Sequence, residues 1–450
     1  MKRMLLAVAT IMILALALAA CGGADDPAPA APEPAATPAP EPAAPEPTEP
    51  EQEPAEEAPD PVTLTVALWH YTIQPEFPDT LNAFTARYPH ISFDIIDTVN
   101  ANFEEVLVTQ LAGGRAIDLV FILSPGLHSN LVQAGQLTDL TDFVNELNRD
   151  GALGTAPDII RTEDDRFFAV PWRQDFWGLF YNKDIFEAAG EPLPENLTWA
   201  EYEALAARLT EGAGLDKQYG SHLHTWNIIV QGIAGAQAGQ SLINTDYSFL
   251  YDAYTMRLNM INDGTIMDFG VIMAANVGYR PRFEDGNAAM IPMGSWYLGE
   301  LAERATFNWG LAPMPQLPGA TGTTTLGNVT PIGIPTSAAH PAEAMKFIEF
   351  ATGEEGALIL ANVGIPSAFS SPAVTETFFA MPGMPLDELS MRAFNPDVVV
   401  REWPIHPLSG IASAILGEEH QLILIGDNSV ADGIRRMEER VAAEIEQFGN

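Results

Sequence analysis

Three apolar segments, separated by helical patterns, constrain the fold more than any other feature of the chain. Residues 62–69 alternate between apolar and polar positions as strands do, and residues 91–96 form a second strand after a helical pattern over 81–88. Residues 118–123 form a third, almost continuously apolar run. Strands that are apolar on both faces are typical of parallel sheets covered by helices. The pattern therefore predicts an α/β fold.

The 61 residues before the first strand are interpreted as a targeting segment followed by a linker. Residues 1–20 begin with Lys2 and Arg3 and continue as a short apolar, alanine-rich run, which is typical of a signal peptide. Residues 21–61 consist mainly of proline, alanine and glutamate and contain no large apolar side chain. Because such a segment cannot offset the entropy cost of ordering its backbone, we expect an extended linker.

The charge balance excludes one class of partner. The chain of 450 residues carries 60 acidic and 21 basic residues, a formal net charge of −39. Nucleic-acid binding needs basic side chains that neutralise phosphates, so we expect no nucleic-acid partner. The single cysteine, Cys21, permits no intrachain disulfide.

One segment combines strand signals with aromatic and charged residues. Residues 167–170 are apolar and β-prone and end at Pro171, which cannot donate to a central ladder, and residues 177–181 form a second, aromatic strand. Four residues lie between these two predicted strands: Trp172, Arg173, Gln174 and Asp175. This placement suits a cleft between two lobes, and a tryptophan-rich core is the open alternative.

Two further patterns predict turns and helix ends. Residues 182–189 predict a short helix that Asn182 or Asp184 caps and that Gly190 closes in the left-handed conformation. In the second pattern, residues 283–296, Gly294 and Ser295 can start a helix whose N-terminus faces a cleft, with Trp296 at its mouth.

The aromatic segment and the pattern at 283–296 resemble the extracellular solute-binding proteins of ABC transporters, family 1, the maltodextrin-binding and related sugar-binding group. The resemblance rests on Gly-Leu-Phe-Tyr-Asn-Lys-Asp-Ile-Phe at 178–186 and on Phe-x-x-Gly-x-Ala-Ala-Met followed by Gly-x-Trp at 283–296. It implies a two-lobed periplasmic-binding-protein-like fold of type II. In that fold each lobe is a mixed, mainly parallel sheet flanked by helices, and hinge crossovers join the lobes.

The resemblance also implies a division of the chain. The first lobe is expected to comprise residues 62–170 and 329–365, and the second lobe residues 171–328 and 366–450. Asn328 departs from the paired glycines that the family often carries at this place.

The resemblance further implies a ligand site between the lobes, where rings stack on sugar faces and polar side chains bind hydroxyl groups. Asp175 is the preferred acceptor because it lies six residues before Tyr181 of the motif. For each tryptophan, core packing is the open alternative. The candidate rings are Trp69, Trp172, Trp226, Trp296 and Trp403. The other candidate contacts are His70, Ser124, Arg173 and Ser295.

The sequence Leu18-Ala19-Ala20-Cys21 resembles a bacterial lipobox. The resemblance implies cleavage before Cys21 and a diacylglycerol on its thiol, which would hold the protein on the outer face of the bacterial cell membrane. An ordinary signal peptide or an uncleaved anchor is the alternative.

The expected function is the substrate-binding lipoprotein of an ABC importer, a monomer that captures a mono- or oligosaccharide and delivers it to the permease membrane subunits. We expect no cofactor, and no metal, because His222 and His224 lack a third ligand. A non-sugar solute such as a polyamine, a structural or sensory lipoprotein, and a glycoside hydrolase with two carboxylates remain alternatives.

Overall fold

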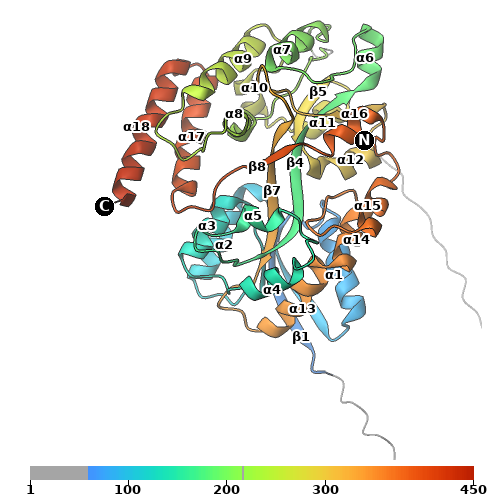
Figure 1. Ribbon diagram of the computed structural model, residues 1–450, viewed down its shortest axis with the longest axis vertical. Coiled ribbons are helices and arrows are strands. Elements are labelled where there is room, and N and C mark those ends of the chain that lie inside the picture. Colours follow the sequence, from blue (N-terminus) through green and yellow to red (C-terminus); the bar gives the residue numbers. More distant parts are fainter. Residues whose placement is uncertain (1–58, 215–216, 450) are drawn as a thin grey trace, which may run out of the picture. The chain divides into compact units, whose positions relative to one another are not determined.

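The computed structural model describes residues 59–214 and 217–449 (Figure 1). The expected signal peptide, Cys21 and nearly all of the expected linker lie outside the described residues. Among the helices that are described, none is long and apolar enough to cross a membrane.

The elements follow one another from β1 to α18. The first half contains β1 (Val62–Trp69), α1 (Glu76–Arg87), β2 (Ile91–Thr98), α2 (Asn100–Ala112), β3 (Leu119–Phe121), α3 (Pro125–Gln133), α4 (Thr141–Leu147), α5 (Ala156–Ile160), β4 (Val170–Asn182), α6 (Lys183–Ala189) and α7 (Trp199–Arg208). The middle contains η2 (Asn227–Ile229), α8 (Gln231–Ala238), η3 (Ser248–Leu250), α9 (Tyr251–Asn262), α10 (Phe269–Ala275), α11 (Tyr279–Glu284), β5 (Met290–Gly294), η4 (Ser295–Tyr297), α12 (Leu298–Arg304) and β6 (Trp309–Ala312). The last part contains β7 (Thr324–Gly333), α13 (Pro341–Thr352), α14 (Glu354–Asn362), α15 (Pro372–Phe379), α16 (Glu388–Ala393), β8 (Val398–Arg401), α17 (Ser409–Leu424) and α18 (Val430–Gly449).

The strands form one connected arrangement in the order β2-β1-β3-β7-β4-β5, in which β6 also pairs with β4 and β8 with β7. In the first lobe β1 pairs in parallel with both β2 and β3, as the opening pattern of the sequence predicts. In the second lobe β4 pairs antiparallel with β5 and β6. The two-lobed, mixed α/β architecture is confirmed, and the parallel ladders lie mainly in the first lobe.

Strand β4 differs from the sequence expectation, which placed two strands on either side of Pro171. It is a single strand of 13 residues that includes Pro171 and the four residues after it. Pro171 lies opposite Pro331 of β7, and the register shifts between Pro171 and Arg173. Because neither proline has an N–H to donate, each can occupy a ladder position where its partner requires no donor. The strand therefore passes through the prolines instead of ending there.

Separate hydrophobic cores lie at the two ends of the paired strands β4 and β7, which run side by side between the lobes in Figure 1. Helices α1, α2, α3 and α13 cover the first core, and α7, α8, α9, α17 and α18 cover the second. The expected boundaries at 170/171 and 328/329 fall inside β4 and β7, so the exact division into lobes stays a prediction.

The expected ends of helix α6 are confirmed. The side chain of Asn182 accepts hydrogen bonds from the backbone N–H groups of Asp184 and Ile185, at 3.0 and 3.1 Å. Gly190 ends the helix with a φ of 68°, a conformation that glycine adopts without a steric penalty.

Gly327 of β7 is expected to tolerate no side chain, because β7 is paired on both sides there. An added Cβ would lie 2.2 Å from Cγ1 of Val399 and 2.9 Å from the carbonyl oxygen of Asp175. We predict that Gly327→Ala lowers the free energy of unfolding by about 1–3 kcal/mol, measured by urea denaturation. Gly417→Ala in α17 is the control, because its Cβ would meet nothing within 4 Å. It should raise stability by about 0.5–1 kcal/mol. Equal stability of Gly327→Ala and wild type would contradict the expected clash.

Candidate ligand-binding site

A cavity of about 600 Å³ lies where β4 and β7 pass from the first core to the second. From the first lobe it is lined by Trp69, His70, Gln74 and Leu123. From β4 and β7 it is lined by Arg173, Asp175, Trp177, Asn328 and Thr330. From the rest of the second lobe it is lined by His224, Trp226, Ile228, Asn276, Gly278, Tyr279, Arg280, Pro281, Trp296 and Glu402.

Three indole rings form one side of the cavity, and we call Trp177, Trp226 and Trp296 the tryptophan wall. The ring centroids of Trp177 lie 5.3 Å from Trp296 and 6.4 Å from Trp226, and both pairs are perpendicular. Trp226 and Trp296 lie 6.2 Å apart. Gly294 makes this arrangement possible, because a Cβ there would stand 1.9 Å from the ring of Trp296.

A buried ion network lies beside the tryptophan wall. Arg173 donates from Nη1 to Oε1 of Glu76 at 2.7 Å and from Nε to Oγ1 of Thr330 at 3.2 Å. Its Nε also lies 3.4 Å from Oδ2 of Asp175, and the hydroxyl of Ser295 donates to Oδ1 of Asp175 at 3.4 Å. Burial raises the pKa of both Glu76 and Asp175, and the guanidinium of Arg173 opposes that rise.

Glu402 joins the tryptophan wall to the charged side of the cavity. Its Oε1 accepts a hydrogen bond from Nε1 of Trp177 at 2.7 Å. Burial raises the pKa of Glu402 to about 7, the bond from Trp177 lowers it, and the charge of Asp175 raises it further. Glu402 is therefore a carboxyl group that changes its charge near neutral pH.

The segment that carries His224 and Trp226 is held by a buried arginine. Nη2 of Arg257 donates to the carbonyl oxygens of Leu223 and His224 at 3.2 and 2.7 Å. Arg257 is only 1% exposed, and burial lowers its pKa to about 10, so it stays cationic at neutral pH. No carboxylate of the described chain pairs with it. Burial also lowers the pKa of His224 to about 4, so this ring is neutral in the cavity wall.

The structure brings six of the ten predicted ligand contacts to the cavity: Trp69, His70, Arg173, Asp175, Trp226 and Trp296. Trp226 is 36% exposed and offers free ring surface, whereas Trp69 is 1% exposed and packs against Phe77 and Phe103. His70 holds a φ of 52°, an uncommon conformation for a residue other than glycine, directly after β1.

The other four predicted contacts occupy different places. Trp172 is fully buried in the first core, with ring centroids 4.7 Å from Phe121 and 5.4 Å from Phe77, and Trp403 is 8% exposed in the second core. Ser124 caps α3 by accepting from the N–H of Leu127. Ser295 is buried behind Asp175 and does not line the cavity. For Trp172 and Trp403 the core alternative is therefore the one that the structure supports.

The sequence analysis does not identify several residues that line the cavity. For one of them, Trp177, the alternation of side chains along β4 is a usable signal. Successive side chains of a strand point to opposite faces, so Arg173, Asp175 and Trp177 share one face. Because the sequence analysis expects a strand to end at Pro171, it does not place these three residues on one strand. Tyr279, Asn328 and Glu402 come from three other segments, and only the fold brings them together.

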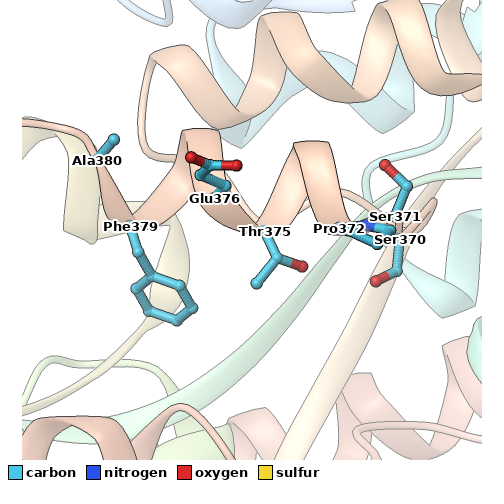
Figure 2. A pocket seen from close by; sticks show the side chains of 7 residues that line it. All are labelled: Ser370, Ser371, Pro372, Thr375, Glu376, Phe379 and Ala380. Carbon is cyan, nitrogen blue, oxygen red and sulfur yellow. The ribbon is translucent and has the colours of Figure 1, made fainter.

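A second hollow, of about 780 Å³, runs along α15. Figure 2 shows its lining, in which Thr375 and Phe379 project from the same side of the helix. Glu376 is its only charged lining residue and is exposed. Because this hollow has neither buried charges nor several rings, we take the cavity between the lobes as the candidate site.

Two α/β lobes joined by long strands, with rings and charges around a cavity between them, define the class of two-lobed binding proteins. Residues 67–358 match the family of bacterial extracellular solute-binding proteins, and the chain belongs to this family.

Similar proteins include sugar-binding members. The chain is 27% identical to a lactose-binding protein of Rhizobium radiobacter over 54% of this chain and 59% of that protein. A sugar transporter from Rhizobium etli, solved in an open conformation, has a TM-score of 0.72 and 32% identity over 85% of this chain and 99% of that one. An ABC substrate-binding protein from Listeria monocytogenes, solved with cycloalternan, has a TM-score of 0.74 at 20% identity, covering 86% of this chain and all of that one.

We predict that Glu402 makes stability fall as the pH rises. The folded state keeps the Glu402 proton up to about pH 7, whereas an exposed glutamate loses it near pH 4.3, so the folded state binds more protons between these values. The contribution of Glu402 to the free energy of unfolding should therefore fall by about 1–3 kcal/mol between pH 5 and 8. Glu402→Gln should remove this decline and keep the acceptor for Trp177. Chemical denaturation of both proteins across this pH range tests the prediction, and identical pH profiles would contradict it.

Proposed function

We propose that the protein is the substrate-binding component of an ABC importer and captures a carbohydrate, a mono- or oligosaccharide, in the cavity between its lobes. The observation that carries the proposal is the tryptophan wall beside the carboxylates of Asp175 and Glu402. Indole rings cover the apolar faces of sugars, and carboxylates accept hydrogen bonds from hydroxyl groups. The sugar transporter and the lactose-binding protein among the similar proteins support the same ligand class.

The proposed role is capture and delivery without chemistry. The protein binds the carbohydrate as a monomer. It then delivers the carbohydrate to the membrane subunits of a permease. A bound oligosaccharide is expected to be recovered intact after prolonged incubation. Chromatography of the recovered ligand separates this role from that of a glycoside hydrolase, which would release shorter products.

The tryptophan wall should supply much of the affinity. We predict that Trp226→Ala and Trp296→Ala each weaken binding of the carbohydrate by about 10-fold or more, because each removes a ring face from the cavity. The ligand is first found by a thermal-shift screen of sugars, since saturation at about 100 times the dissociation constant should stabilise the protein by about 2.7 kcal/mol. Affinities are then measured by titration calorimetry.

Tyr251→Ala is the matched control for the tryptophan variants. Tyr251 is a half-exposed aromatic residue at the start of α9 and does not line the cavity. This variant should bind as wild type does. Unchanged affinity in Trp226→Ala and Trp296→Ala would place the carbohydrate elsewhere and contradict the proposed site.

We also propose that the protein is anchored to the outer face of the cell membrane by a lipid on Cys21. Two or three acyl chains give stable anchoring. We predict that Cys21→Ser moves the protein from the membrane fraction to the soluble extracytoplasmic fraction with its affinity unchanged. Fractionation and mass spectrometry of the mature N-terminus test this, and an unmodified N-terminus at Cys21 would contradict it.

A further inference from the structure

We propose that the carbohydrate carries a protonated amino group, so that the substrate class is a cationic amino sugar or an oligosaccharide that contains one. This inference rests on the proposed function, because it concerns the ligand of the same cavity. It follows from the charge balance of the cavity, from the acceptor capacity that its carboxylates keep, and from the geometry of its rings.

Among the residues that line the cavity and their ion-pair partners there are four carboxyl groups, those of Glu76, Asp175, Glu300 and Glu402, and two guanidinium groups, those of Arg173 and Arg280. The cation of Arg257 does not line the cavity and donates to backbone carbonyl oxygens behind His224. Arg173 contacts two of them, Glu76 and Asp175, and has no contact with Glu402. Arg280 donates from Nε and Nη2 to the two carboxylate oxygens of Glu300, so its charge is already neutralised. His224 adds no positive charge, because burial holds its pKa at about 4. With Glu402 ionised, the cavity keeps an excess of negative charge that a neutral sugar would leave uncompensated.

Two of these carboxylates retain acceptor capacity toward the cavity. Both protein contacts of Asp175, from Arg173 and Ser295, are long at 3.4 Å. Glu402 accepts one bond, from Trp177, through Oε1 alone. Both residues line the cavity, so a donor on the ligand can reach them. An ammonium group offers several donors and a compensating charge, whereas a hydroxyl group offers one donor and no charge.

The rings beside the carboxylates pack edge to face against one another, and Trp226, which is 36% exposed, offers free ring surface to the cavity. Trp177 is perpendicular to both Trp226 and Trp296, and the ring of Tyr279 lies 5.8 Å from that of Trp226. A cation placed over a ring face is attracted by the electrons of that ring, most strongly when the ring is that of tryptophan. The exposed ring of Trp226 and the carboxylates of the cavity therefore favour the same group, an ammonium.

The test compares sugars that differ only by an amino group. The pairs are glucose and glucosamine, galactose and galactosamine, mannose and mannosamine, and β-1,4-linked oligomers of glucose and of glucosamine. Calorimetric titration near neutral pH should show that at least one amino sugar binds about 10-fold or more tightly than its neutral partner. The preference should survive high salt, because buried charge pairs are screened less than the acidic surface.

Conservative variants assign the preference to the cavity. Glu402→Gln and Asp175→Asn keep the shape of the side chains and remove one charge each, so they should reduce the preference for the amino sugar about 10-fold. Glu376→Gln is the matched control, since it removes the same charge from the exposed hollow along α15 (Figure 2). It should leave the preference unchanged.

The outcomes separate this inference from the proposed function. Equal or tighter binding of the neutral partners, or an amine preference that Glu376→Gln lowers as much as Glu402→Gln, would overturn the inference and leave carbohydrate capture intact. Failure of every carbohydrate, charged and neutral, in a protein that is stabilised by spermidine would overturn both.

Discussion

The antiparallel pairing of β4 with β7 is the interaction on which the rest of the structure depends. The ladder runs from Val170 opposite Ile332 to Phe176 opposite Gly327. Its first end is buried in the first core and its second end leads into the second core, and Phe180 of β4 belongs to a third cluster in the second lobe. Separate cores therefore share one pair of strands. Because side chains alternate along a strand, a slip of one residue would turn Arg173 and Asp175 away from the cavity. The register of this ladder therefore fixes both the fold and the composition of the site.

The buried ion network adds geometry to this frame rather than net stability. Burying charges costs desolvation free energy, which the attraction within the network at best offsets. The network fixes the orientation of the side chains, because Arg173 of β4 donates to Glu76 of α1 and to Thr330 of β7. Asp175 is bound in turn to Ser295 at the end of β5. One set of contacts thus ties elements of both lobes to the same point of β4 and holds the polar wall of the cavity.

The sequence predicted the architecture well, because periodicity and helix-capping residues act locally. The parallel pairing of β1 and β2 and the ends of α6 at Asn182 and Gly190 follow from such local rules. The site was predicted only in part, because a tryptophan in a strand has no local signal for the face it occupies. Trp172 and Trp177 look alike in the sequence, yet they lie an odd number of residues apart in one strand, so the first side chain is in the first core and the second is at the cavity. The expected strand end at Pro171 concealed this relation. Glu402, which lies after β8, could not be assigned before β8 was known to pair with β7.

Burial raises the pKa of Asp175 and of Glu402 because desolvation of their charges outweighs the attraction of Arg173 to the first and the hydrogen bond from Trp177 to the second. Burying these carboxylates costs folding free energy, as is common at functional sites. A ligand that donates to them replaces missing interactions without requiring the side chains to be reordered, since the bond to Trp177 and the contact with Arg173 already orient them. A ligand with donor groups is therefore favoured over one that only fills the space, and the proposed preference for an amino sugar rests on this difference.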